Sequence, residues 1–404
     1  MRIAIFENIM TPGGHEVDFD RLLTEELKTL GHSVSFYVPE GFRFSLDYGV
    51  PTHELNGEVV SYSGVTGLKK FWRTLTRERR RLGWYRQLYA AATDGKFDAL
   101  IVPTSTYRYL RALSRSVLRK SPVPLIFILH GINPKEAPKF LQGADSLRNY
   151  PKICPTVITL AADIFGESRE SIRLIPPPTY TPRDIDWQPG EANFWPQAPR
   201  LQNFIGEGSL DSDTRPLLLG FFGQFRREKR LEDFLRTYLS ANFRRPAKLL
   251  VQGSTMHPED AVAFTDIIHR YQKEKSLVFW HKGLVGYEWQ EAIAAVDALL
   301  MPYSAPRYLY HWGGMLFTAI GYQKPMVASD DMNPEVFSRF PVGETFKSGD
   351  LAALKTTLEN FVNNFGERQP LYAQALREAA AVYSPGAFAR RLTQIMEEHR
   401  CSYV

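Results

Sequence analysis

Short apolar runs alternate with glycine loops and amphipathic stretches along both halves of the chain. The runs predicted as buried strands are 2–6, 33–38, 97–102, 124–129, 156–160 and 173–175, and then 217–222, 248–252, 277–280, 298–301 and 325–329. Continuous apolar runs with helices between them are typical of parallel sheets that are covered on both faces. The pattern therefore predicts an α/β fold with two doubly wound, Rossmann-like domains that face each other across a cleft.

Apolar residues at helical spacing predict the connecting helices. Phe19, Leu22, Leu23 and Leu27 mark the first of them, and Gly31 follows it as a C-cap. Further helices are expected at 161–168, 231–239, 288–296, 315–322, 351–365, 371–383 and 387–399.

A proline-rich stretch with few periodic apolar residues separates the two halves. We therefore expect an N-terminal domain at 1–176, a linker at 177–216, a second domain at 217–384 and a terminal helix at 385–404.

Composition narrows the class of protein only slightly. The net charge of +5 and the pI of about 9.0 suit anionic small molecules, an anionic membrane surface or nucleic acid. Cys154 and Cys401 lack the spacing of a metal or redox site, which fits a reducing cytoplasm. No apolar run approaches the ~20 residues of a transmembrane helix, and the first residues do not form a signal peptide. We expect a cytoplasmic protein, with peripheral attachment to the inner face of the membrane as a further option.

The most basic stretch is 68–86, in which lysines and arginines surround Phe71, Trp72, Leu75, Leu82 and Trp84. A helix with cations around an aromatic stripe suits the surface of an anionic membrane. The same pattern also fits a solvated helix whose apolar stripe faces its own domain. Nucleic acid is the third interpretation, but no nucleic-acid-binding motif accompanies the stretch, so we expect no nucleic-acid partner.

Two glycine loops in the second half carry the strongest signals for anion binding. Gly313 and Gly314 open a predicted helix that continues through Met315, and helix N-termini bind phosphate through backbone N–H groups. The loop after 217–222 begins with Gly223 and is predicted to form a diphosphate clamp with two cations, Arg226 and Lys229. A solvated loop of charges remains the alternative for this second loop.

Other polar or glycine positions follow predicted strands, at the sheet edge where open α/β folds bind ligands. Gly13 and Gly14 form a loop after the first strand, although a simple turn explains them equally well. His130 ends the strand 124–129 and has either a structural or a functional role. Gly253 and Lys282 follow two strands of the second half, and we expect both in the donor site.

In order along the chain, these motifs resemble those of the GT-B glycosyltransferases, and within them the retaining, family-four-like enzymes. The opening MRIAIFENIMTPGGHEVDFDRLLTEELKTLGHSV is similar to that family's first strand, glycine loop and Gly-His-x-Val turn. LLLGFFGQFRREKRLEDFL resembles its glycine loop with lysine, and LVFWHKGLVGYEWQEAIAAVDALLMPY its Gly-x-Val turn, helix and strand. IGYQKPMVASD resembles the strand entry after the nucleotide-binding helix.

The resemblance implies a division of labour between the halves. The C-terminal half would bind a nucleotide-sugar, with Lys229 and Arg226 on the diphosphate and the amides of Gly313 and Gly314 beside it. His130 would lie near the transferring sugar. The glycine pair 13–14 would approach the donor from the other domain, and the terminal helix would cross back to the N-terminal domain.

Four positions depart from the family's usual pattern, and one of them is Gln323, where the family has the glycine of a Gly-x-Pro. Tyr310 and Thr318 stand where relatives carry two glutamates that contact the donor sugar and the ribose, and Gln224 replaces an arginine. The phosphate-binding residues are therefore kept while the sugar and ribose contacts differ. We interpret Tyr310, His311 and Trp312 as replacements for those contacts. Met315 and Thr318 complete the predicted donor site.

These features predict a glycosyltransferase that moves a sugar from a nucleotide-sugar to a lipid-linked or polysaccharide acceptor in bacterial-type surface glycan synthesis. We expect a retaining enzyme with no metal, since no Asp-x-Asp motif occurs, and with no cofactor besides the nucleotide-sugar substrate. Two alternatives remain: a non-catalytic relative that binds nucleotide-sugar or glycan, and a nucleotide-sugar epimerase on the same architecture.

Overall fold

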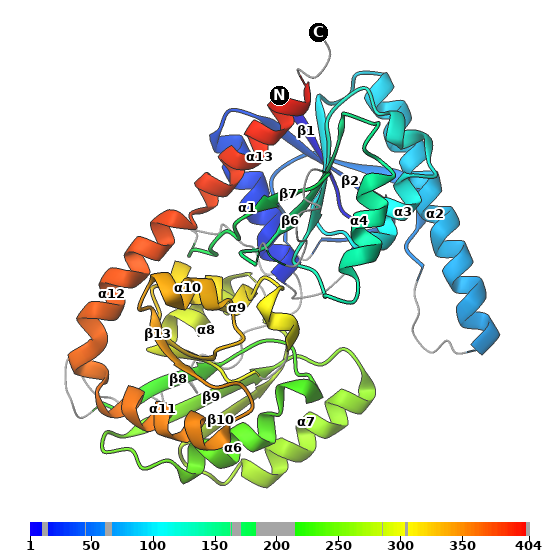
Figure 1. The fold of residues 1–404 in the computed structure, drawn as a ribbon. Coiled ribbons are helices and arrows are strands. Elements are labelled where there is room, and N and C mark those ends of the chain that lie inside the picture. The colour runs from blue at the N-terminus through cyan, green and yellow to red at the C-terminus, as the bar shows by residue number, and fades with distance from the viewer. Residues whose placement is uncertain are drawn as a thin grey trace.

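The chain folds around two separate parallel sheets (Figure 1). The computed structural model describes residues 1–9, 15–44, 46–60, 67–161, 163, 171–182, 215–284, 286–303 and 306–400. The first sheet has the strand order β3-β2-β1-β4-β5-β6-β7, and the second has the order β10-β9-β8-β11-β12-β13. The prediction of two doubly wound α/β units is confirmed.

The first half consists of β1 (Arg2–Phe6), α1 (His15–Thr29), β2 (Ser33–Glu40), β3 (Thr52–Glu58), α2 (Gly67–Thr93), β4 (Ala99–Val102), α3 (Tyr107–Leu113), the 3-10 helix η1 (Val117–Lys120), β5 (Leu125–Leu129), α4 (Ala137–Asp145), β6 (Ile153–Ile158) and β7 (Arg173–Ile175). Successive residues of its strands pack into different hydrophobic cores on opposite faces of the sheet. Ile3 and Ile5 pack with α1, whereas Ala4 and Phe6 pack on the side of α2 and α3. This period of two covers both faces of the sheet with apolar contacts.

The second half consists of β8 (Leu217–Phe221), the 3-10 helix η3 (Arg227–Lys229), α6 (Leu231–Ser240), β9 (Ala247–Gly253), α7 (Pro258–Tyr271), β10 (Leu277–His281), α8 (Gly286–Ala295), β11 (Ala298–Met301), the 3-10 helix η4 (Pro306–Leu309), α9 (Gly314–Gly321), β12 (Met326–Ser329), α10 (Pro334–Arg339), β13 (Gly343–Phe346), α11 (Leu351–Asn363), α12 (Phe365–Val382) and α13 (Pro385–Arg400). Every strand pair in both sheets is parallel.

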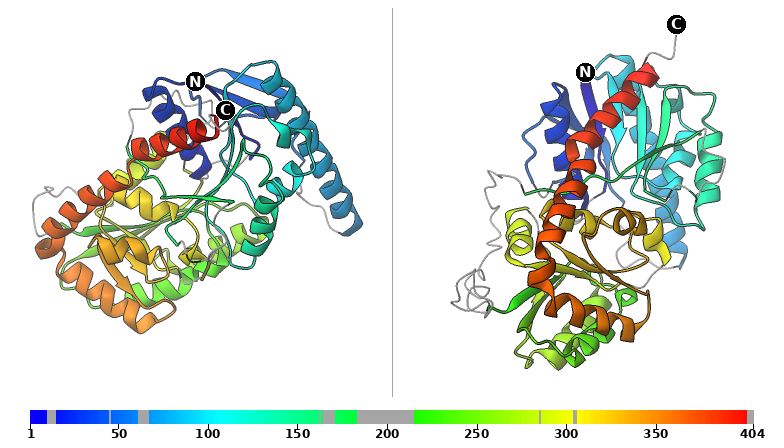
Figure 2. Two further views of the ribbon diagram at one scale, coloured as in Figure 1. Left: turned by 45° about the horizontal axis from the view of Figure 1, so that its top comes forward. Right: turned by 60° about the vertical axis from the view of Figure 1, so that its left-hand side comes forward.

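The last helix leaves the second half and lies against the first (Figures 1 and 2). Its Phe388 ring packs edge-on against Phe19 of α1 with centroids 5.7 Å apart, and the side chain of Thr393 hydrogen-bonds His32 at 3.2 Å. At its end, the carbonyl of Arg400 accepts a hydrogen bond from Lys152 at 2.7 Å. The C-terminal chain thus connects the two halves on one side of the molecule.

Several predicted boundaries were wrong. The predicted helix 371–383 begins earlier, at Phe365, and runs through Pro370. The basic helix predicted at 68–86 is longer and ends at Thr93. The strand β3 was missed because its sequence, THELNGE, is polar and mostly exposed at the sheet edge. Most of the predicted helix 161–168 and most of the linker 177–216 lie outside the described residues.

An ion pair holds the start of β1 to the segment before β4. Arg2 donates its backbone N–H and its guanidinium to Asp98 at 2.8 Å and 2.7 Å, and these hydrogen bonds lower the pKa of Asp98 to about 2. Because the folded pKa lies below the unfolded value, the pair stabilises the fold above about pH 4, and that contribution is lost as the pH falls toward 2.

We therefore expect Asp98→Asn to lower the unfolding temperature modestly at pH 7, because this pair is solvent-exposed. The difference from the wild type should shrink as the pH falls from 4 to 2. Asp94→Asn, at an exposed aspartate of the same loop, is the control. A difference that stays constant across this pH range would contradict the assignment.

Candidate functional site between the two sheets

The loops after β8, β9 and β10 are joined into one rim at the carboxyl edge of the second sheet. Gln252, at the end of β9, makes the connection: its Oε1 accepts from the Gly223 N–H at 2.9 Å, and its Nε2 donates to the Lys282 carbonyl at 2.5 Å. Ser254 adds a backbone contact, because its carbonyl accepts from the Phe225 N–H at 2.8 Å. The loop that carries Gly223 is therefore held in place from two sides. The sequence marked Gln252 only as a polar residue at the end of an apolar strand.

Lys229 lies inside this rim and not on its outside. It ends η3 and is only 8 % exposed. Its Nζ lies 4.5 Å from the centroid of the Tyr303 ring, and a Cβ added to Gly223 would lie 3.5 Å from the same Nζ. A glycine at 223 therefore leaves room beside the ammonium group. The structure places a buried cation where the sequence predicted a diphosphate clamp.

Tyr303, which the sequence analysis missed, forms one wall around that cation. Its hydroxyl donates to the Phe222 carbonyl at 3.3 Å, and burial raises the pKa of Tyr303 far above its usual range. The ring therefore stays a neutral phenol and offers its face to the ammonium, an arrangement that stabilises a cation without neutralising it. The signal in the sequence is a tyrosine directly after the Met-Pro that ends β11.

Arg226 is exposed and contacts its own loop. Its Nη2 donates to Gln224 Oε1 at 3.1 Å, and its Nη1 lies 3.8 Å from Glu228. The structure thus puts the Arg226 guanidinium beside Gln224, the position at which relatives carry an arginine. The Arg226 carbonyl accepts a hydrogen bond from the Lys229 N–H at 2.9 Å, so the backbone of η3 holds the two residues together in this loop.

Lys282 forms an ion pair on the far side of the rim. Its Nζ lies 3.0 Å from Glu288 Oε1 in the first turn of α8, and the Glu288 side chain is only 2 % exposed. Burial is the main cause that raises the pKa of Glu288, while the Lys282 ammonium opposes this rise. Lys282 is therefore partly neutralised, which makes it a weaker anion ligand than the sequence suggested.

The start of α9 differs in detail from the prediction. Gly313 N–H donates to Asn333 Oδ1 at 3.0 Å, and Gly314 N–H donates to the Trp312 carbonyl at 3.0 Å. Both amides therefore have a partner within the chain, and their contact with an anion stays a prediction. Among the described residues, no hydrogen-bond partner is found for the Met315 N–H, which makes Met315 the better candidate at this helix N-terminus.

Thr318 is buried one turn further along α9. Its hydroxyl donates to the Gly314 carbonyl at 2.9 Å, so only its oxygen lone pairs are left to meet a ligand. Gly253, at the end of β9, has a packing role, because an added Cβ would lie 2.8 Å from the Phe264 ring. Gly13 and Gly14 lie outside the described residues.

The carboxyl edges of the two sheets meet at a short backbone bridge. Gly131, after β5, pairs antiparallel with His311, after β11, and the Tyr310 carbonyl accepts from the Ile132 N–H at 3.4 Å. Gly131 adopts φ +95°, and a Cβ there would lie 2.5 Å from the His311 Cα. The segment predicted to contact the donor sugar is thus held by its backbone against the other half.

His130 lies among aromatic rings at this contact. Its ring centroid is 4.5 Å from Phe19 and 5.1 Å from Trp312, and Trp312 also stacks on Tyr180 at 5.4 Å. Its Nε2 lies 2.8 Å from the Pro103 carbonyl, which assigns the ring proton to that nitrogen. His130 therefore joins the two halves, and its structural interpretation has direct support, while a contact with substrate stays a prediction.

Asn333 holds the turn before α9 and was missed in the sequence, where Asn-Pro before a helix was its only signal. Its Nδ2 donates to the His311 carbonyl at 3.2 Å in addition to the Gly313 contact, and its own φ is +42°. We expect Asn333→Ala to cost about 1–3 kcal/mol of folding free energy, because buried backbone groups lose their partners. A thermal unfolding scan measures this loss. Asn333→Gly also loses these hydrogen bonds but tolerates the positive φ, so it should cost somewhat less than Asn333→Ala, and a loss near zero in Asn333→Gly would mean that the hydrogen bonds contribute little.

Two surveys of the described residues complete the site. No group of three or more histidine, cysteine, aspartate or glutamate side chains in them is arranged to hold a metal ion. None of the described helices has the length and apolar content needed to cross a bilayer.

Comparison with known proteins was made at the level of sequence and of structure. No family model matches the sequence, and no curated protein matches it either. Solved structures do match over nearly the full length. The sucrose-phosphate synthase of Thermosynechococcus elongatus aligns with a TM-score of 0.66 at 14 % identity, covering 98 % of each chain.

Two further structures show the same agreement. The Anabaena protein HepE, solved with UDP and glucose, has a TM-score of 0.63 at 11 % identity over 98 % of this chain and 99 % of its own. WaaG, a glycosyltransferase of lipopolysaccharide biosynthesis, has a TM-score of 0.62 at 14 % identity with the same coverage. Two Rossmann-like domains with facing carboxyl edges define the class. Within it, the chain has the fold of the GT-B glycosyltransferases, which confirms the resemblance at the level of fold and is consistent with a family-four-like fold.

Proposed function

We propose that the protein is a glycosyltransferase that takes a sugar from a nucleotide-sugar donor. The observation that carries this proposal is the buried Lys229 ammonium beside Gly223, at the carboxyl edge of the second sheet of a GT-B fold. The HepE structures contain UDP or UDP-glucose, which supports a nucleotide-sugar as the donor class.

The position of Lys229 also supports an assignment of donor and acceptor to different halves of the chain. Residues 217–384 would hold the donor, with the diphosphate against Lys229 and the Met315 N–H, and residues 1–176 would hold the acceptor. Lys229 would stabilise the negative charge that develops on the leaving diphosphate. We propose a retaining reaction without a metal or another cofactor, as the family resemblance implies. The acceptor would be a lipid-linked sugar or polysaccharide of a cell-surface glycan.

A thermal-shift screen tests the donor. Purified protein is heated with UDP, GDP, dTDP, ADP or CMP and with their common sugar conjugates, since a ligand of the folded state raises the unfolding temperature. We expect a rise with one nucleotide class that is lost in Lys229→Ala. No rise with any of them would contradict the proposed donor site.

A non-catalytic binding protein is the second candidate. Tyr310 and Thr318 replace the two glutamates of relatives. The Tyr310 carbonyl accepts hydrogen bonds from the Ile132 N–H and, at 3.5 Å, from the Thr159 hydroxyl. This candidate predicts nucleotide-sugar binding with no sugar transfer to any acceptor.

We also propose that α2 touches an anionic membrane. The inner part of α2 buries Trp84, Tyr85 and Leu88 in its own domain, whereas Phe71 and Trp72 near its start are 63 % and 62 % exposed. The start of α2 projects from the body of the molecule (Figures 1 and 2). The inner part of α2 thus fits the interpretation of an apolar stripe that faces its own domain, and its start fits the interpretation of a membrane contact.

The double change Phe71→Ser and Trp72→Ser should weaken binding to phosphatidylglycerol vesicles about tenfold or more, because two aromatic side chains lose their apolar contact. Co-sedimentation measures this binding. Val262→Ser on α7 is the matched control, since Val262 is also 63 % exposed but belongs to the other half. Equal vesicle binding by all three proteins would contradict a membrane contact through α2.

A further inference from the structure

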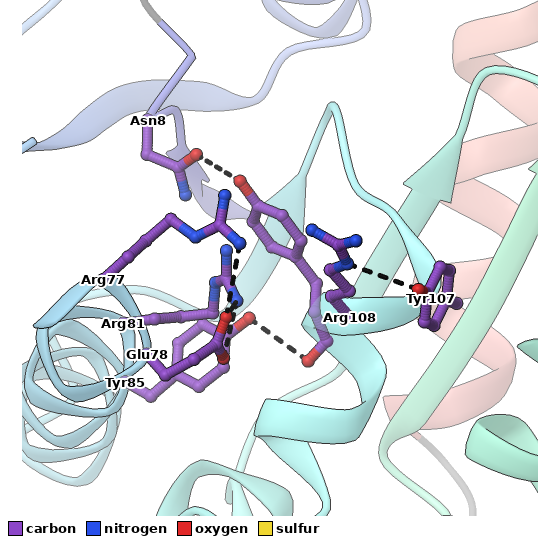
Figure 3. Close-up of polar contacts among 8 residues, drawn as sticks. Asn8, Arg77, Glu78, Arg81, Tyr85, Tyr107 and Arg108 are labelled. Carbon is purple, nitrogen blue, oxygen red and sulfur yellow. Dashed lines mark hydrogen bonds and ion pairs between the residues drawn. The ribbon is translucent and has the colours of Figure 1, made fainter. Parts of the chain in front are cut away.

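We propose that the acceptor carries a phosphate group and that this group binds at an arginine cluster formed by Arg77 and Arg81 of α2 and Arg108 of α3. The inference rests on the proposed function and names the chemistry of its acceptor. The cluster lies at the carboxyl edge of the first sheet, next to Asn8, which follows β1 (Figure 3). This edge faces the half that holds Lys229.

Arg81 forms the fixed centre of the cluster. Its side chain is only 5 % exposed, its Nη1 donates to both carboxylate oxygens of Glu78 at 2.9 Å, and its guanidinium stacks 4.1 Å from the centroid of the Tyr109 ring. Tyr109 in turn donates its hydroxyl to Asn8 Oδ1 at 2.6 Å. Among the residues that the structure describes, the buried Arg81 Nε has no hydrogen-bond partner. A buried guanidinium with an unmet N–H indicates a missing acceptor.

Arg77 and Arg108 lie on either side of this centre and reach solvent. Arg77 Nη2 is 3.7 Å from the same Glu78 that pairs with Arg81, and its side chain is 26 % exposed. Arg108 is exposed, and its Nε donates to the neutral hydroxyl of Tyr107 at 3.3 Å. The Glu78 carboxylate is thus shared by the guanidiniums of Arg77 and Arg81, and the Arg108 guanidinium donates to a neutral hydroxyl.

Other charged residues lie near the three arginines. Lys139 of α4 adds a further cation, with its Nζ 5.6 Å from the centroid of the Tyr107 ring. Glu7 uses its Oε1 to accept the N–H groups of Asn8 and Ile9, both at 2.6 Å. The hydrogen bond to Tyr107 is the main cause that raises the pKa of Arg108, and the charges of Glu136 and Glu78 add to this rise. An oxyanion with several oxygens, such as a phosphate, matches several guanidinium N–H groups better than a single carboxylate does.

The position of the cluster along α2 points to a lipid-linked phosphate. Arg77 lies five residues after Trp72 and six after Phe71, which is about 7–9 Å along a helix that rises about 1.5 Å per residue. An amphipathic helix buries its apolar side chains about 5–10 Å into the boundary between headgroups and acyl chains. If the exposed start of α2 enters that boundary end-on, with Phe71 and Trp72 deepest, Arg77 lies at the level at which lipid phosphates occur.

Calorimetric binding of glucose 1-phosphate at low salt tests the proposal. We expect the wild-type protein to bind it, and Arg77→Gln and Arg108→Gln each to weaken it about tenfold, the effect of one lost charge-assisted contact. Neutral methyl glucoside should not bind. Arg111→Gln, an exposed arginine one turn further along α3, is the control and should not change the affinity.

The donor site could also bind glucose 1-phosphate, so Lys229→Ala is included. Binding that is lost in Lys229→Ala and kept in Arg77→Gln and Arg108→Gln would overturn the proposal, and so would no binding to the wild type. The nucleotide thermal shift should be unchanged in the arginine variants. Failure of the donor assignment therefore shows as a missing nucleotide shift, independently of the arginine result.

Vesicles distinguish the two sources of phosphate. Phosphatidylcholine vesicles with phosphatidic acid should bind the wild type better than Arg77→Gln or Arg108→Gln, if the phosphate belongs to a lipid. A loss of glucose 1-phosphate binding without any change on these vesicles would indicate a soluble phosphorylated acceptor and would overturn the lipid part of the proposal.

Discussion

Lys229→Ala should reduce sugar transfer by about 100-fold or more while leaving the fold intact. The size follows from removing one group that stabilises charge on a leaving group, an effect that reaches this scale in a site shielded from water. Lys229 meets that condition, because it is 8 % exposed and lies against the Tyr303 ring at 4.5 Å. The measurement is the transfer rate at saturating acceptor, together with the unfolding temperature.

Lys324→Ala is the matched control for this change. Lys324 belongs to the same half, and burial lowers its pKa. Its ammonium donates to the Ala294 carbonyl at 2.8 Å. Removing it should cost stability and leave the transfer rate nearly unchanged. A near-normal rate in Lys229→Ala would exclude Lys229 from the proposed role.

Gly131→Ala should have the largest effect on the contact between the two halves. A Cβ at 131 would lie 2.5 Å from the His311 Cα and 2.7 Å from the Tyr310 carbonyl oxygen, and neither backbone atom can turn aside as a flexible side chain can. The φ of +95° adds strain for any residue with a Cβ. Together we expect a loss of about 2–4 kcal/mol, from strain and overpacking.

The control separates strain from collision. Gly95 also has a positive φ, +66°, but nothing lies within 4 Å of an added Cβ. Gly95→Ala should therefore lower the free energy of unfolding only through backbone strain, by about 1–2 kcal/mol. Gly131→Ala should exceed it and should also lower nucleotide affinity, because residues 310–312 lead into α9. Equal unfolding temperatures for the two variants would mean that the bridge at Gly131 is not maintained in solution.

The sequence predicted the sheets well because a buried parallel strand leaves a continuous apolar run. β8 and β5, for example, are buried at every position. β3 was not predicted, because a strand at the exposed edge of a sheet needs no continuous apolar run. α7 was not predicted either. Only Phe264 and Ile267 of this helix are buried, so its apolar face is narrow.

The candidate site was predictable in part. The Gly223 loop and Lys229 follow from the rule that ligands bind at the carboxyl ends of strands. The hydrogen bonds that occupy the Gly313 amide depend on Asn333, twenty residues away, and no local pattern reports such a contact. The same holds for the arginine cluster, because Arg77 and Arg108 come together only through the packing of α2 against α3.

The most direct test of the central claim is release of nucleoside diphosphate from a panel of sugar nucleotides, with and without a membrane extract that supplies acceptors. The account predicts release from one sugar nucleotide only when the extract is present, with the sugar recovered on an extractable product, and no release by Lys229→Ala. Conversion of the sugar nucleotide to an epimer, or binding without any release, would contradict the assignment as a glycosyltransferase.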